Sequence, residues 1–182
     1  MGWALSALAS AAIFALVSVL DKRILAVYVP GLPGFYNIVG FMQVGLAIAV
    51  VGLTPWHGGN ILAVTSTTAS GVLWGLTLIF LFYGLRNLEV SRAVPFYNTF
   101  PVFVAFLAVA FLGERLSLIQ WLAIFSVIVG AGFATVGQGA QSEGDLSARK
   151  GFGALILASL FTAGGIVTSK IALEEMDLWN VL

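Results

Sequence analysis

A short run of polar residues stands between two prolines in an otherwise apolar stretch, Pro95-Phe96-Tyr97-Asn98-Thr99-Phe100-Pro101. Pro101 lacks a backbone N–H, so in a helix it leaves the carbonyl of Tyr97 without its usual donor. In hydrocarbon, that carbonyl and the amide of Asn98 both need a partner in protein or water. Two interpretations follow: these groups line a cavity for a solute, or the proline only kinks the helix while Asn98 bonds to a neighbouring helix. Tyr97, Asn98 and Pro101 are therefore the first candidate binding residues.

Two lysines, Lys22 and Lys170, each end a long apolar stretch. Lysines at helix ends commonly extend to the lipid headgroups, which is one interpretation here. The other is that each lysine presents its charge to an anionic group at one mouth of a solute pathway. Trp74 offers a similar choice, because its indole can stack on a flat solute or bind a cation, or can face lipid. Lys22, Trp74 and Lys170 complete the set of candidate pathway residues.

Other reactive side chains are few. The chain has no cysteine and a single histidine, His57, so thiol chemistry is excluded and a histidine-based metal site lacks ligands. The carboxylates of Asp21, Glu89 and Glu114 stand at the ends of apolar stretches or in loops, where Glu114 is expected to pair with Arg115 and fix a turn. None stands in the middle of an apolar stretch, so proton coupling through this part of the chain has no support. No protease motif is visible, and we expect neither an enzyme nor a cofactor.

The composition places the chain in a membrane. Of its 182 residues, 60% are hydrophobic and only 9% are charged, whereas soluble domains carry about 25% charged residues. Lipid must therefore cover much of the surface, and membrane lipid is an expected partner. The net charge is zero, with eight basic and eight acidic residues. Without a basic patch, nucleic acid is not an expected partner.

Charged and turn residues divide the chain into six apolar segments, each close to the roughly 20 residues that a membrane-spanning helix needs. The predicted helices are 2–20, 35–53, 69–85, 93–112, 117–137 and 151–169, with 61–64 as an optional extension of the third. Pro95 is expected to open the fourth helix, and Pro101 to lie inside it. The sequence thus predicts an all-α membrane protein, a polytopic helix bundle.

The polar segment 138–150, QGAQSEGDLSARK, is typical of a linker. After it the chain begins again: Leu157-Ala158-Ser159 matches Leu8-Ala9-Ser10, and Lys170 matches Lys22, although chance similarity between apolar segments stays open. Five helices per repeat would give the two copies opposite orientations, as in many secondary transporters. The predicted organisation is a five-helix repeat in 1–137, a linker in 138–150, and the start of a second, truncated repeat in 151–182.

One stretch is specific enough to suggest a family. Residues 92–137 read RAVPFYNTFPVFVAFLAVAFLGERLSLIQWLAIFSVIVGAGFATVG. The Ala-x-Pro start, the second proline, the Leu-Gly-Glu-Arg-Leu exit and the tryptophan after it resemble an EamA domain of the drug/metabolite transporter superfamily. The resemblance implies ten helices in two inverted five-helix repeats. The missing C-terminal helices, from the same chain or a second copy, are then expected partners.

The resemblance also implies a function. We expect a secondary transporter, or permease, that moves a small metabolite or an amphipathic drug by alternating access between inverted repeats. The alternative is a non-transporting helical subunit or scaffold of the membrane. The chain departs from the small multidrug transporters of the superfamily, which carry a glutamate within the first helix. The expected location is the bacterial cytoplasmic (inner) membrane.

Overall fold

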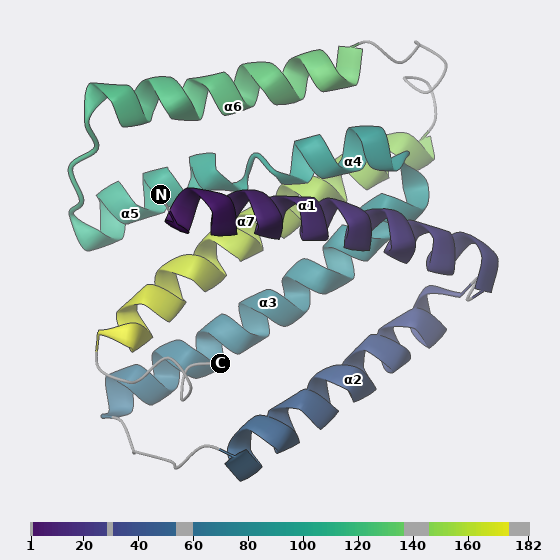
Figure 1. Ribbon diagram of the computed structural model, residues 1–182, viewed down its shortest axis with the longest axis horizontal. Coiled ribbons are helices and arrows are strands. Elements are labelled where there is room, and N and C mark those ends of the chain that lie inside the picture. Colours follow the sequence, from purple (N-terminus) through teal and green to yellow (C-terminus); the bar gives the residue numbers. More distant parts are fainter. Residues whose placement is uncertain (1, 29–30, 54–59, 137–145, 175–182) are drawn as a thin grey trace.

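The computed structural model describes residues 2–28, 31–53, 60–136 and 146–174 (Figure 1). These residues form helices and no strands. In chain order the elements are α1 (Gly2–Arg23), the π-helical turn η1 (Ile24–Tyr28), α2 (Leu32–Leu53), α3 (Ile61–Asn87), α4 (Val90–Tyr97), α5 (Phe100–Leu112), α6 (Leu118–Val136) and α7 (Leu146–Leu173). The prediction of an all-α polytopic bundle is confirmed.

α3 begins at Ile61, so the third helix includes the optional extension 61–64 as well as the expected 69–85. Asn60 caps its start, since the side-chain Oδ1 of Asn60 accepts a hydrogen bond of 2.8 Å from the backbone N–H of Ala63. The polar residues at the start of α3 read as a loop in the sequence. In the structure the hydroxyls of Thr65 and Thr68 bond back to carbonyls one turn earlier, so a helix accommodates them.

The fourth predicted helix, 93–112, is two helices. α4 ends at Tyr97 and α5 begins at Phe100, so the α-helix is interrupted at residues 98 and 99. Pro101 occupies the first turn of α5, where no N–H partner is required, instead of an internal kink. Pro95 lies inside α4, which begins at Val90, and does not open it.

The sixth predicted helix starts earlier than residue 151. α7 begins at Leu146, so the last five residues of the expected linker belong to its first turns. Ser147 ties this end to α3, because its Oγ donates a 2.7 Å hydrogen bond to Oδ1 of Asn87. The remainder of the expected linker, 138–145, lies outside the described residues.

The centre of the bundle is the pair α3 and α7, which run antiparallel (Figure 1). Glycine allows them to approach closely near one end. A Cβ atom on Gly84 would lie 2.5 Å from Cδ2 and 2.6 Å from Cγ of Leu155, and Leu155 is fully buried. Small residues at such contacts are a common means of packing helices in membranes.

The outer helices α1, α2 and α6 present large apolar side chains to their surroundings. Phe41 of α2 is 80% exposed and Phe133 of α6 is 76% exposed. Such faces are stable in hydrocarbon and costly in water. Within the described ranges, four helical stretches are long and apolar enough to cross a membrane: Leu32–Leu53, Ile61–Asn87, Val90–Leu112 and Leu146–Leu173, with Leu118–Phe133 a shorter apolar helix. The chain is an integral membrane protein.

Candidate functional site

The break between α4 and α5 brings polar groups into the buried interior. Pro101 has no backbone N–H to donate to the carbonyl of Tyr97. This carbonyl instead accepts a 2.9 Å hydrogen bond from Oγ of Ser159 on α7. Both residues are buried, Tyr97 at 4% exposure and Ser159 at 0%. At the break itself, Oγ1 of Thr99 donates to the carbonyl of Phe96 at 2.8 Å. The sequence predicted a carbonyl in need of a partner, and the structure supplies that partner from a different helix.

The tyrosine ring continues the polar contacts into the core. Oη of Tyr97 lies 3.0 Å from Oγ1 of Thr162, which lies 3.3 Å from Oγ1 of Thr77. Thr162 also reaches the carbonyl of Ala158 at 2.9 Å, and Thr77 reaches the carbonyl of Leu73 at 3.0 Å. Thr162 has one hydroxyl proton, which it shares between two acceptors, the carbonyl of Ala158 and Oγ1 of Thr77. The Tyr97 hydroxyl is therefore the donor to Thr162, and the polar layer joins α4, α7 and α3.

Asn98 lies at the C-terminus of α4, where its backbone N–H donates to the carbonyl of Val94 at 2.9 Å. Its side chain is half-buried. Within the described ranges, the side-chain amide forms no hydrogen bond. Among the described residues, no neighbouring helix therefore forms a hydrogen bond with the Asn98 side chain. That Asn98 lines a solute cavity stays a prediction.

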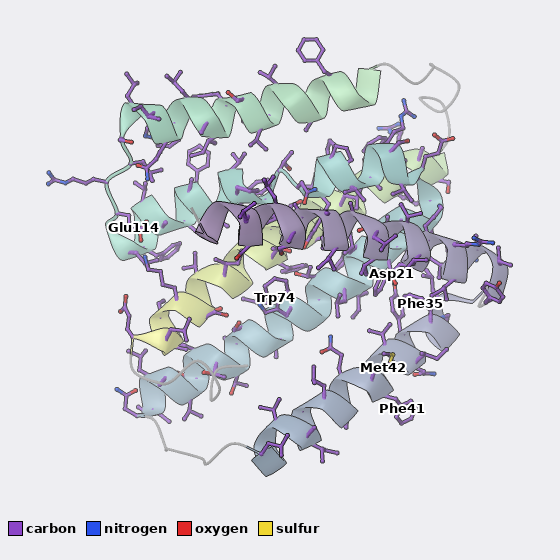
Figure 2. The ribbon with its side chains drawn as sticks, viewed as in Figure 1. Asp21, Phe35, Phe41, Met42, Trp74 and Glu114 are labelled. Carbon is purple, nitrogen blue, oxygen red and sulfur yellow. The ribbon has the colours of Figure 1, made fainter. Side chains whose placement is uncertain are left out.

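Trp74 lies apart from the break, in a cavity of about 780 Å³ formed by α2, α3 and the end of α7. Its indole projects from α3 toward α7 (Figure 2), with Nε1 only 3.1 Å from where a Cβ of Gly165 would be. The polar residues of the cavity lining are Tyr36, Gln43, Ser70 and Ser169. The size matches the range of small-molecule sites, about 300–1,000 Å³.

The two lysines contact protein groups at opposite ends of the bundle, because α1 and α7 run in opposite directions (Figure 1). Nζ of Lys22 donates to the backbone carbonyls of Leu85, Arg86 and Leu88, the last at 2.9 Å. The Lys22 ammonium group therefore supplies a hydrogen-bond donor and a positive charge to backbone carbonyls at the C-terminus of α3.

Lys170, at the other end, forms an ion pair with Glu114 in the α5–α6 connection. Both side chains are partly exposed, and Figure 2 places Glu114 where α5 ends. The expected pairing of Glu114 with its neighbour Arg115 is therefore replaced by a contact across the bundle. The six candidates do not form one site: three lie at the break, one in the cavity and one at each end.

The structure adds four residues to the functional candidates: Gln43, Thr77, Ser159 and Thr162. Thr162 and Ser159 belong to an apolar helix and stand three residues apart, a spacing that puts both on one helix face. Gln43 is the amide nearest the middle of α2, a helix rich in apolar residues. Each is a polar residue deep in a spanning segment, and that signal could have been read from the sequence.

Comparison with known protein families settles the class. The profile of the EamA-like transporter family matches residues 1–136, a span that includes the broken helix and the Leu-Gly-Glu-Arg-Leu exit. The chain belongs to the EamA-like transporter family. Comparisons with the curated proteins and with solved structures returned no match. The EamA-like match ends before α7 begins, although α7 packs against α3, α4 and α5.

Proposed function

We propose that this chain belongs to a secondary transporter that moves a small metabolite or an amphipathic drug across the membrane by alternating access between inverted repeats. The family match over residues 1–136 carries the proposal. The opposite directions of α1 and α7, each closed by a lysine, support the inverted arrangement. The proposed location is the bacterial cytoplasmic membrane. Helices beyond those of residues 1–182, from the same polypeptide or from a second copy, would complete the second repeat.

The break and the cavity support a path for solute. Tyr97, Asn98 and Pro101 place polar groups at the broken helix, and Trp74 supplies an aromatic surface to the cavity. Lys22 and Lys170 stand in the last turns of α1 and α7. These helices end at opposite sides of the bundle (Figure 1), where a solute would enter or leave. Alternating access requires α7, the first helix of the second repeat, to move relative to α3 of the first.

A reversible cross-link tests that movement. Oγ of Ser70 on α3 and Oγ of Ser169 on α7 lie 2.6 Å apart, and the chain has no cysteine of its own. The double variant Ser70→Cys/Ser169→Cys of the full-length protein, reconstituted in proteoliposomes, is expected to lose uptake of a panel of labelled metabolites and dyes when oxidised. Reduction should restore uptake, and each single variant should show the same uptake under oxidising and reducing conditions.

Two results would contradict the proposal. Uptake that continues unchanged with the cross-link formed would show that α3 and α7 move as one body. Absence of saturable uptake and of counterflow for the whole panel, in the uncross-linked protein, would favour the non-transporting subunit or scaffold. The same assay on residues 1–182 alone tests the need for further helices, which predicts no uptake from this segment unless it assembles as a homodimer.

A further inference from the structure

Contacts between α2 and α3 define how these two helices are aligned beside the cavity that contains Trp74. Two residues of the cavity lining connect the helices: Oη of Tyr36 on α2 donates a 2.7 Å hydrogen bond to the carbonyl of Ile79 on α3. The rings of Phe35 and Phe82 meet edge-on nearby, with their centroids 4.6 Å apart. The helices run in opposite directions (Figure 1). Gln43 lies about two turns further along α2 than Tyr36, and Trp74 lies about one and a half turns back along α3 from Ile79. Both Gln43 and Trp74 line the cavity.

Gln43 has an amide that the described part of the chain does not satisfy. It lies near the middle of α2, and its side chain makes no hydrogen bond with any described residue. An amide without a partner in an apolar medium is costly, because it loses its hydrogen bonds to water and gains none in return. A membrane helix therefore keeps such a group where protein, water or a solute can meet it. Since the amide faces a cavity, water or a solute is the available partner.

The other polar side chains that line the cavity already form hydrogen bonds within the protein. Oγ of Ser70 and Oγ of Ser169 bond to each other, and the hydroxyl of Tyr36 is bonded to Ile79. No charged side chain lines the cavity within the described residues. An ionised solute at this depth would have no counter-charge, which is costly in a membrane. The remaining recognition groups are one amide, with a donor and an acceptor edge, and the indole of Trp74.

We propose that this cavity binds an uncharged, planar solute whose hydrogen-bonding edge pairs with the Gln43 amide and whose ring packs on Trp74. The inference rests on the proposed function only in calling the solute a transported substrate. A lipid acyl chain is the competing occupant of a cavity that is largely apolar. An acyl chain needs no amide, so replacing Gln43 distinguishes the two occupants.

The test measures equilibrium binding to the full-length protein in detergent, with no flux required. The probes are nicotinamide, its anionic analogue nicotinate and its cationic analogue 1-methylnicotinamide, with uracil and adenine as further neutral heterocycles. At least one neutral heterocycle is expected to bind saturably, and nicotinamide at least tenfold more tightly than its two charged analogues. Gln43→Leu should weaken that binding tenfold or more, because the amide is lost while the volume is nearly kept.

Phe41→Leu is the matched control. Phe41 lies two residues earlier on α2, is 80% exposed and points away from the bundle (Figure 2). Its replacement should leave binding unchanged. Trp74→Leu should weaken binding of the neutral probe, and Trp74→Phe should retain more of it, because a ring surface remains.

The remaining outcomes overturn either the inference or the proposed function, and they distinguish between the two. Failure of every neutral heterocycle to bind, or equal binding by the Gln43→Leu variant, would mean that the amide recognises nothing planar. Tighter binding of either charged analogue would assign another substrate class. Heterocycle binding without any transport would leave the site standing and refute the proposed function. Transport that is unaffected by Gln43→Leu would refute the inference and leave the proposed function standing.

Discussion

Oγ of Ser159 on α7 donates a 2.9 Å hydrogen bond to the backbone carbonyl of Tyr97 on α4. This carbonyl is the acceptor that Pro101, four residues later, cannot serve. The two residues are 62 positions apart in the sequence and both are buried. The bond therefore links the broken helix to the helix that follows the expected linker, and it makes Pro101 and Ser159 energetically dependent on each other.

A double-mutant cycle measures that dependence. Ser159→Ala should lower the free energy of unfolding by about 1–3 kcal/mol, because a buried carbonyl loses its partner. In a Pro101→Ala background the new backbone N–H can serve the Tyr97 carbonyl, so the same change should cost less. Thermal unfolding in detergent gives the loss of unfolding free energy in both backgrounds, and equal losses would contradict the coupling.

The Pro101→Ala variant alone should insert into the membrane normally but transport solute poorly. Unchanged solute flux would show that the interruption between α4 and α5 serves only helix packing.

Tyr97→Phe and Thr162→Val test the direction of the hydrogen bond between these residues. Tyr97→Phe removes a donor and leaves Thr162 bonded to the carbonyl of Ala158, so stability should fall by less than about 1 kcal/mol. Thr162→Val leaves the buried Tyr97 hydroxyl without its acceptor and should cost about 1–3 kcal/mol. Chemical or thermal unfolding of both variants provides the comparison. A larger loss from Tyr97→Phe would reverse the assigned donor.

Gly84→Ala should disrupt the packing of α3 on α7. The added methyl would lie 2.5 Å from Cδ2 and 2.6 Å from Cγ of Leu155. This leucine is fully buried, so its side chain would have to shift within the packed interface. Overpacking of this kind costs about 1–3 kcal/mol. Gly75→Ala on the same helix meets nothing within 4 Å and should keep or raise the melting temperature, since alanine favours helix. Similar melting temperatures for the two variants would show that the close approach is not limiting.

Asn98→Leu separates a solute-facing amide from one that joins helices. Because the Asn98 side chain has no hydrogen bond among the described residues, the apo melting temperature should stay the same or rise, while substrate affinity falls. Asn87→Leu is the control, since Asn87 bonds to the carbonyl of Tyr83 and to Ser147, both at 2.7 Å. That variant should lose about 1–3 kcal/mol. A large drop for Asn98→Leu, with the substrate-induced shift intact, would place Asn98 among the packing residues.

Lys22→Met and Lys170→Met should differ although both lysines close a helix. Lys22 serves three carbonyls near the C-terminus of α3, so its loss should cost about 1–2 kcal/mol. Lys170 and Glu114 form a partly exposed pair, worth about 0–1 kcal/mol and weakened by salt. Unfolding at low and high ionic strength distinguishes them. A strong salt dependence for Lys22 would show that its carbonyl contacts do not dominate.

Much of this architecture follows from local sequence. Long apolar runs with charges at their ends specify helices in lipid, because an apolar helix satisfies its own backbone hydrogen bonds. The prolines around Tyr97 and Asn98 marked where the fourth helix would be irregular, because proline removes a donor wherever it stands. Boundaries were less accurate: Asn60 and Thr65 read as a loop, yet a side-chain cap and bonds to the previous turn make them helical.

The partners of the polar groups did not follow from the sequence. Ser159 meets the Tyr97 carbonyl, Thr162 meets the Tyr97 hydroxyl, and Lys170 meets Glu114, each across more than 50 residues. Whether such groups meet depends on how each helix is rotated and where α3, α4 and α7 cross. Those quantities come from the packing of side chains such as Leu155 against Gly84. A local pattern shows that a buried polar group needs a partner, but the crossing of the helices selects which residue provides it.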